Sequence, residues 1–108
     1  MRYCLALDLV NEAEKIAAYE AYHKEVWPEI IDSITSSGIQ TMEIYRVENR
    51  LFMIMETDAS FSFEAKSLSD TSNPKVQEWE KLMWSFQKPL PWAKTGEKWV
   101  MMDQIFEL

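Results

Sequence analysis

The spacing of apolar residues along the chain changes between two periods, and each change marks the end of a predicted element. Four segments are rich in apolar residues at strand spacing: residues 2–10, 39–47, 51–58 and 98–106. The second and third are separated only by Glu48-Asn49-Arg50, in which Asn49 tolerates a positive φ, so we expect a hairpin there.

A first helical segment follows the first strand. Ile16, Tyr19, His23 and Trp27 recur at spacings of three, four and four, which places them on one helical stripe. We expect Asn11 to be the N-cap of this helix. We also expect Pro28 to kink it near Trp27 and to open a second helical piece that ends near Ser37. Gly38 would close that piece as a left-handed cap.

A second helical segment begins at Asn73-Pro74, an N-cap followed by a first-turn proline. Its apolar stripe consists of Val76, Trp79, Met83 and Phe86, and the Lys-Pro-Leu-Pro run of residues 88–91 ends it. The polar stretch before it, residues 59–71, is expected to hold a short helix around 63–68.

The predicted order of elements is β-α-β-β-α-β, which is the pattern of an α+β, ferredoxin-like fold formed by one domain over residues 1–108. In residues 51–55 and 98–106 both alternate rows of side chains are apolar. Helices on one side of the sheet would cover only one row, so we predict a homodimer whose sheets pack face to face. The alternative is a monomer in which loop and C-terminal residues cover the second face.

The charge balance excludes several classes of partner. The chain has 11 basic and 18 acidic residues, a formal net charge of −7, with no basic run. Phosphate backbones and anionic membranes repel such a surface, so we expect neither nucleic-acid nor membrane binding. Cys4 is the only cysteine and no long apolar stretch is present, which favours a soluble protein of the reducing cytoplasm. Aromatic residues make up 13% of the chain and favour an aromatic-walled pocket.

His23 is the first candidate for chemistry because it is the only histidine, and histidine is the side-chain type that ordinarily gains and loses protons near neutral pH. Tyr19 lies one turn before it and Trp27 one turn after it, as expected for a proton-transfer site that holds a small polar ligand. The alternative is a histidine with a purely structural hydrogen bond. One His, one distant Cys and no carboxylates at ligand spacing predict no metal site. With only two glycines there is no phosphate-binding loop.

Three further residues are candidates for the wall of a ligand pocket. Trp79 can pack its indole against a flat or sugar-like ligand, or serve only as a core anchor. Glu80 can accept hydrogen bonds from a ligand, or belong to a solvated helix face. Met42 can line the pocket, or simply fill the core.

Taken together, these residues resemble one enzyme family. The run Tyr19-x-x-x-His23-x-x-x-Trp27-Pro28-Glu29, with Gly38, the Glu-Ile-Tyr of residues 43–45 and the helix that carries Trp79, resembles the L-rhamnose mutarotase family of sugar anomerases. The resemblance spans nearly the whole chain. It implies a dimeric α/β-barrel of ferredoxin-like protomers that interconverts the α and β anomers of a 6-deoxyhexose without a cofactor. It also implies that His23 is the proton donor and that Tyr19 contacts the sugar.

Two positions depart from the L-rhamnose pattern. Rhamnose enzymes have a tyrosine in place of Met42, and a Trp-Trp pair in place of Trp79-Glu80. The C-terminal half, including Trp92 and the run Gly-Glu-Lys-Trp of residues 96–99, looks more like the L-fucose mutarotase branch. Met42, Trp79 and Glu80 are therefore expected to bind substrate, and we favour L-fucose over L-rhamnose.

In this interpretation His23 delivers a proton to the ring oxygen of the sugar. Tyr19 holds a sugar hydroxyl or relays a proton there, and Trp79 supports the apolar face of the sugar. The complementary base is Glu80 or a water molecule. The rival functions on the same fold are a haem- or quinol-type monooxygenase, which would bind haem, and a non-catalytic ligand-sensing domain.

Overall fold

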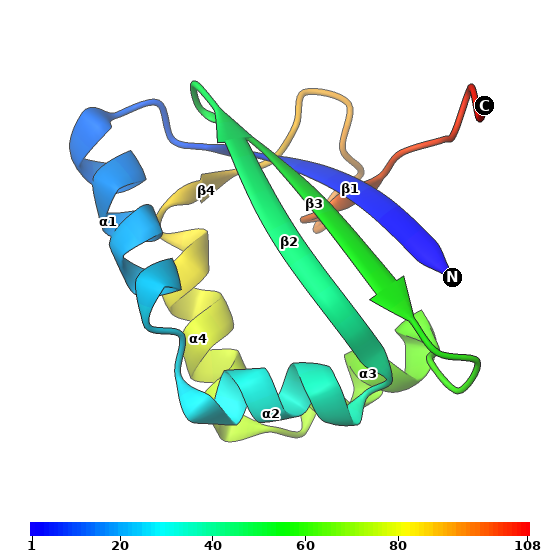
Figure 1. The fold of residues 1–108 in the computed structure, drawn as a ribbon. Coiled ribbons are helices and arrows are strands. Elements are labelled where there is room, and N and C mark those ends of the chain that lie inside the picture. The colour runs from blue at the N-terminus through cyan, green and yellow to red at the C-terminus, as the bar shows by residue number, and fades with distance from the viewer.

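The computed structural model describes residues 1–108, which form one antiparallel sheet and four helices (Figure 1). The strands are β1 (Arg2–Leu9), β2 (Ile39–Val47), β3 (Arg50–Thr57), β4 (Gln87–Lys88) and β5 (Val100–Met101). The helices are α1 (Ala13–Lys24), α2 (Pro28–Ser36), α3 (Phe63–Thr71) and α4 (Pro74–Trp84).

The topology confirms the α+β, ferredoxin-like prediction. The strand order is β2-β3-β1-β4, every pairing is antiparallel, and β5 pairs with β1 beside β4. Helices α1 and α2 connect β1 to β2, and α3 and α4 connect β3 to β4, so each half is a split β-α-β unit. Figure 1 shows the helices together on one side of the sheet.

Several local predictions are confirmed by the backbone. Asn73 caps α4 through its side-chain oxygen, which accepts from the backbone N–H groups of Lys75 and Val76. Pro28 is the first residue of α2, and Gly38 follows this helix with φ of 102°. A Cβ at Gly38 would lie 2.6 Å from the Asp58 carboxylate, so both backbone angle and space favour glycine there.

Other local predictions are wrong. The N-cap of α1 is Glu12 rather than Asn11, in an extended conformation and without a side-chain cap. The first helix does not kink at Trp27 but ends at Lys24, and Trp27 is extended because the following proline disfavours helical angles. In the hairpin, Glu48 rather than Asn49 has the positive φ, of 51°.

The C-terminal predictions need the largest correction. The strand expected over 98–106 is only Val100–Met101, extended by a hydrogen bond from the Met102 N–H to the Cys4 carbonyl. Strand β4 falls partly in the run expected to end the helix, because Lys88 and Gln87 pair with Asp8 and Leu9 of β1. This pairing is tertiary, and no local pattern marks it.

The core lies between the helices and one face of the sheet. Leu5, Leu7 and Leu9 on β1 and Leu51 and Met53 on β3 are buried there. The intervening residues point to the opposite side, because side chains alternate along a strand. We call that side the far face. Its members on β1, β2, β3 and after β5 include Cys4, Ala6, Tyr45, Val47, Phe52, Ile54 and Met102.

Candidate active site

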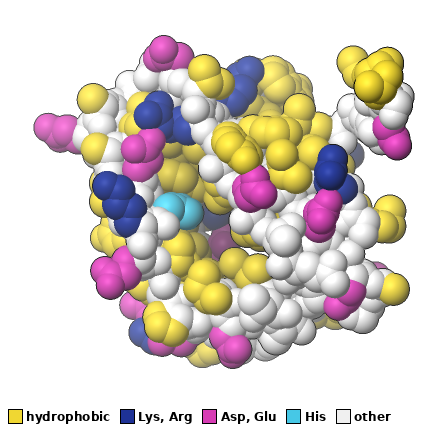
Figure 2. All heavy atoms as spheres, viewed as in Figure 1, with side chains coloured by type: hydrophobic (Ala, Val, Ile, Leu, Met, Phe, Trp, Pro, Cys, Tyr) yellow, Lys and Arg dark blue, Asp and Glu magenta, His cyan; other side chains and the backbone are white.

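A cavity of about 870 Å³ lies between the helices and the covered face of the sheet. Its wall includes all five site residues predicted from the sequence: Tyr19, His23, Met42, Trp79 and Glu80. Figure 2 shows the His23 ring at the edge of a hollow with apolar side chains around it. The structure therefore brings these five candidates together in the wall of one cavity.

His23 lies in the last turn of α1, and its ring is fixed by a backbone hydrogen bond. Its Nδ1 is 2.8 Å from the carbonyl oxygen of Tyr19, one turn earlier. A carbonyl can only accept, so Nδ1 carries a proton and donates it to Tyr19. The other ring nitrogen, Nε2, is consequently the one that can gain or lose a proton toward a ligand.

Tyr19 is almost fully buried beside this histidine. The two ring centroids are 4.3 Å apart at an interplanar angle of 35°, and the Tyr19 hydroxyl accepts a hydrogen bond from the side-chain amide of Gln87 at 3.3 Å. Burial raises the pKa of Tyr19 to about 12, the Gln87 hydrogen bond opposes this, and the negative charge of Glu80 adds to it. The phenol therefore stays protonated at neutral pH and can donate a hydrogen bond.

Trp79 is the centre of an aromatic cluster. Its ring meets those of Trp27, His23 and Tyr22 edge to face, at centroid separations of 5.0, 5.7 and 6.3 Å. Trp27 reaches this cluster from outside any helix. Trp79 is 5% exposed and lines the cavity, so it is both a core anchor and a wall of the site.

Met42 and Glu80 occupy different environments in the same wall. Met42 is partly buried on β2 and packs against the apolar cluster that contains Met53 and Met55. Glu80 is also partly buried, and its carboxylate lies 2.5 Å from the Lys98 ammonium. The cavity wall therefore holds one charged pair beside many apolar side chains.

Gln87 and Lys98 are cavity residues that sequence reasoning missed. Lys98 sits just before β5 with a side chain only 15% exposed, and its ammonium is 5.2 Å from the ring centroid of Trp84. Gln87 reaches the site through its pairing with Leu9 of β1, and Lys98 lies two residues before β5, which also pairs with β1. The only sign of Gln87 in the sequence is that it is a polar residue shortly after the end of α4.

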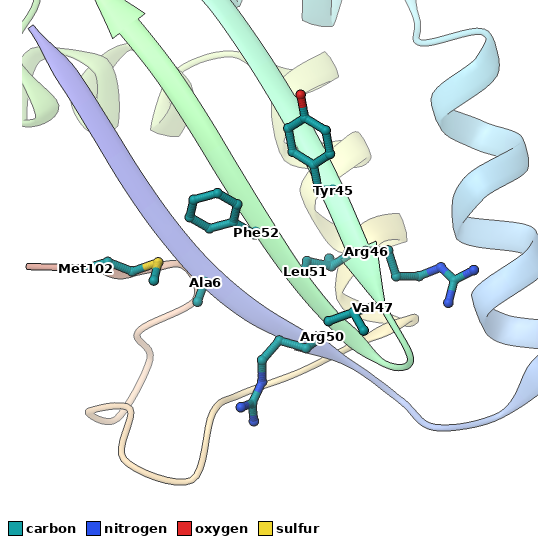
Figure 3. Close-up of a pocket in the computed structure, with 8 residues that line it drawn as sticks. All are labelled: Ala6, Tyr45, Arg46, Val47, Arg50, Leu51, Phe52 and Met102. Carbon is teal, nitrogen blue, oxygen red and sulfur yellow. The ribbon is translucent and has the colours of Figure 1, made fainter. Parts of the chain in front are cut away.

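The molecule has a second, smaller cavity and no evident metal cluster. The smaller cavity, of about 360 Å³, lies on the far face and contains none of the predicted site residues. Figure 3 shows Tyr45, Phe52 and Met102 around it. No three His, Cys, Asp or Glu side chains lie close enough together to share a metal ion. No helix has the length and apolarity needed to cross a membrane.

Comparison with solved structures shows which proteins share this fold. The fold resembles a crystal structure of an L-rhamnose mutarotase from Formosa agariphila, with a TM-score of 0.74 and 17% identity over 100% of this chain and 98% of that one. It also resembles a dimeric ferredoxin-like protein from an uncultured marine organism, with a TM-score of 0.53, 14% identity, and 99% and 90% of the two chains covered. At such identities these likenesses establish the fold alone.

The sequence comparisons go further. The chain is 44% identical over 109 residues to an L-fucose mutarotase from Xanthomonas campestris pv. campestris, covering 99% of this chain and 87% of that protein. The family description "L-rhamnose mutarotase" matches residues 2–108. The chain belongs to the L-rhamnose mutarotase family. It is an isomerase of the sugar mutarotase class.

Proposed function

We propose that this mutarotase acts preferentially on L-fucose and that His23 carries its acid–base chemistry. The observation that carries the proposal is the fixed His23 ring, with Nδ1 held by the Tyr19 carbonyl at the wall of an aromatic cavity. The 44% identity to an L-fucose mutarotase supports the choice of sugar. L-Rhamnose is the alternative substrate.

Mutarotation requires only two proton transfers and one rotation. The anomeric hydroxyl loses its proton, its electron pair forms the carbonyl at C1, and the C1–O5 bond breaks. Its electrons remain on the ring oxygen, which takes up a proton. Rotation about C1–C2 and reversal of these transfers closes the ring as the other anomer. Positioned proton transfer of this kind contributes roughly 10²–10⁴-fold.

The residues divide these tasks by their chemistry. His23, protonated at Nε2, gives its proton to the ring oxygen and recovers it on closure. Tyr19 remains protonated and donates a hydrogen bond to a sugar hydroxyl, since its pKa is raised to about 12. The indole of Trp79 packs against the C–H face of the sugar, beside the apolar side chain of Met42. Glu80, or a water molecule beside it, receives the proton of the anomeric hydroxyl.

The pair of Glu80 and Lys98 supports the preference for L-fucose. A carboxylate and an ammonium present acceptors and donors to hydroxyl groups, whereas an indole at position 80 would present an apolar surface. L-Fucose and L-rhamnose differ in the stereochemistry of their hydroxyl groups. A charged pair in the wall can therefore discriminate between them through hydrogen bonds that only one sugar makes.

We further propose that the active form is a cytoplasmic homodimer in which two far faces pack together as a dimeric α/β-barrel. Tyr45 and Val47 are 54% and 69% exposed on that face, and its apolar rows run across β2, β3 and β1. The single, unpaired Cys4 is compatible with a reducing compartment.

The activity is tested by NMR exchange between the anomeric protons of L-fucose and of L-rhamnose with trace protein. We expect faster exchange for L-fucose, and a loss of roughly 10²–10⁴-fold in His23→Ala. Glu80→Gln separates the two candidate bases, because a comparable loss identifies the carboxylate and a small one the water.

Lys24→Ala, in the same turn but exposed, is the matched control and should keep wild-type exchange. Full activity of His23→Ala would overturn the assignment of the acid. A preference for L-rhamnose would overturn the choice of sugar. Acceleration of neither sugar would overturn both and leave haem titration as the next test.

A further inference from the structure

We propose that Gln87 belongs to the sugar-binding machinery: its Oε1 accepts a hydrogen bond from a sugar hydroxyl while its Nε2 orients the Tyr19 hydroxyl. This inference rests on the proposed function, because it names the ligand by that function. It adds a binding and positioning residue that no sequence motif marks.

The first observation is an unsatisfied atom. Gln87 is 6% exposed, and its Oε1 is the one buried side-chain nitrogen or oxygen in the molecule that lacks a hydrogen-bond partner. Leaving a buried acceptor without a partner is unfavourable by the full cost of its desolvation. Gln87 is a wall residue of the large cavity, and we take a sugar bound there as the source of the missing donor.

The second observation is the direction of the neighbouring hydrogen bond. Gln87 Nε2 donates to the Tyr19 hydroxyl oxygen at 3.3 Å. The oxygen of Tyr19 thus acts as acceptor toward Gln87, and its own proton remains free to donate. Gln87 and Tyr19 together offer one acceptor and one donor from adjacent groups.

A sugar hydroxyl suits this pair because it both donates and accepts. One hydroxyl, or two on neighbouring carbons, can give a proton to Oε1 and take one from Tyr19. An ionised carboxylate or a fully ionised phosphate group has no proton to donate to Oε1. The chemistry of the pair therefore favours a polyhydroxylated neutral ligand over an anionic one.

Strand β4 holds the amide in place. Gln87 pairs with Leu9 of β1, and its neighbour Lys88 pairs with Asp8. Side chains alternate along a strand, so Gln87 is buried while Lys88 is exposed. Lys88→Met is therefore a matched control that changes the same strand without entering the cavity.

The test compares L-fucose with its 2-, 3- and 4-deoxy analogues, measured by calorimetric binding and by anomer exchange. Gln87→Met keeps the length of the side chain and removes both hydrogen-bonding groups. We expect L-fucose to bind Gln87→Met about tenfold more weakly than wild type. We also expect one deoxy analogue to bind both proteins equally, because it lacks the hydroxyl that Oε1 contacts.

Gln87→Glu serves as the conservative variant because it keeps an acceptor oxygen. It should retain discrimination among the deoxy analogues, whereas Gln87→Met should lose it at one position. Lys88→Met should match wild type. Thermal melts of all variants report folding separately. Equal weakening for every analogue, or unchanged binding in Gln87→Met, would overturn the proposal in favour of a purely structural amide.

The binding data keep this proposal separate from the proposed activity. If wild type binds L-fucose in a Gln87-dependent way but does not accelerate exchange, the proposed activity is wrong and the role of Gln87 stands. If exchange is accelerated and Gln87→Met behaves as wild type, the reverse holds. Absence of any L-fucose binding would overturn the role of Gln87.

Discussion

The two faces of the sheet differ in whether their polar groups have partners. The face covered by helices buries Tyr19 and Gln87 within a cavity and leaves one buried acceptor without a partner. On the far face, Arg2 pairs with Glu56 at the surface and Arg50 pairs with the buried Asp8, and the remainder is largely apolar. A buried polar group without a partner in the wall of a cavity indicates a small ligand, whereas an uncovered apolar face indicates a large apolar partner.

This difference predicts that substitutions on the two faces fail in different ways. On the covered face, a large-to-small change leaves a void inside a closed core and lowers the free energy of unfolding. On the far face, a change leaves the core between the helices and the sheet intact, so it should affect assembly first. The following predictions test that separation.

The largest expected effect is that of Trp79→Ala. Trp79 is 5% exposed at the centre of the aromatic cluster, so its truncation should lower the free energy of unfolding by about 3–5 kcal/mol. Chemical denaturation measures this value. Trp84→Ala, on the same helix but 36% exposed, is the control and should lose far less. Similar losses for both would mean that the cluster is not the core of the covered face.

The next effect concerns Phe52 on the far face. Phe52→Asp places a charge in the centre of the apolar surface, and we expect the dimer dissociation constant to rise at least about 100-fold. The monomer should remain folded. Sedimentation velocity and far-UV circular dichroism measure the two properties.

Leu68→Asp is the control for Phe52→Asp. Leu68 is an apolar side chain, 68% exposed on α3, away from the far face, so its replacement should leave the dimer intact. A wild-type protein that sediments as a monomer at micromolar concentration would contradict the homodimer directly. Equal dissociation by both variants would contradict the far face as its interface.

The sequence predicted the covered face better than the chain end. Tyr19 could be grouped with His23, and Val76 with Trp79 and Met83, because helical spacing places residues three or four apart on one side, and a helix keeps that order wherever it packs. Pro28 and Asn73 also act locally, through backbone angle and capping. These features depend on residues that are neighbours in the sequence, so they can be predicted without knowledge of the tertiary structure.

Gln87 and the short β5 could not be predicted in the same way. Gln87 lies in a strand because it pairs with Leu9 of β1. Strand β5 is short because only Val100 and Met101 pair with β1. The overlong strand expected over 98–106 came from apolar composition alone. Ile105 and Phe106 are instead 96% and 75% exposed, in a tail that leaves the body of the molecule (Figure 1).

The smallest expected effect is the contribution of Tyr19, on the covered face, to the pH dependence of the free energy of unfolding. The pKa of Tyr19 is raised from 10.0 to about 12 in the folded protein, mainly by burial. Between these values the unfolded chain loses the phenol proton while the folded chain retains it, so the free energy of unfolding falls as pH rises. From pH 9 to pH 11 the contribution of Tyr19 to this fall is about 1 kcal/mol.

Urea unfolding of wild type and Tyr19→Phe at pH 9 and pH 11 measures that contribution. The other tyrosines are present in both proteins, so the difference between the two pH dependences isolates Tyr19. We expect wild type to lose about 1 kcal/mol more than Tyr19→Phe over this range. Equal pH dependences for wild type and Tyr19→Phe would mean that the Tyr19 hydroxyl is solvated. It would then not be held in the closed pocket that the proposed hydrogen bond to the sugar requires.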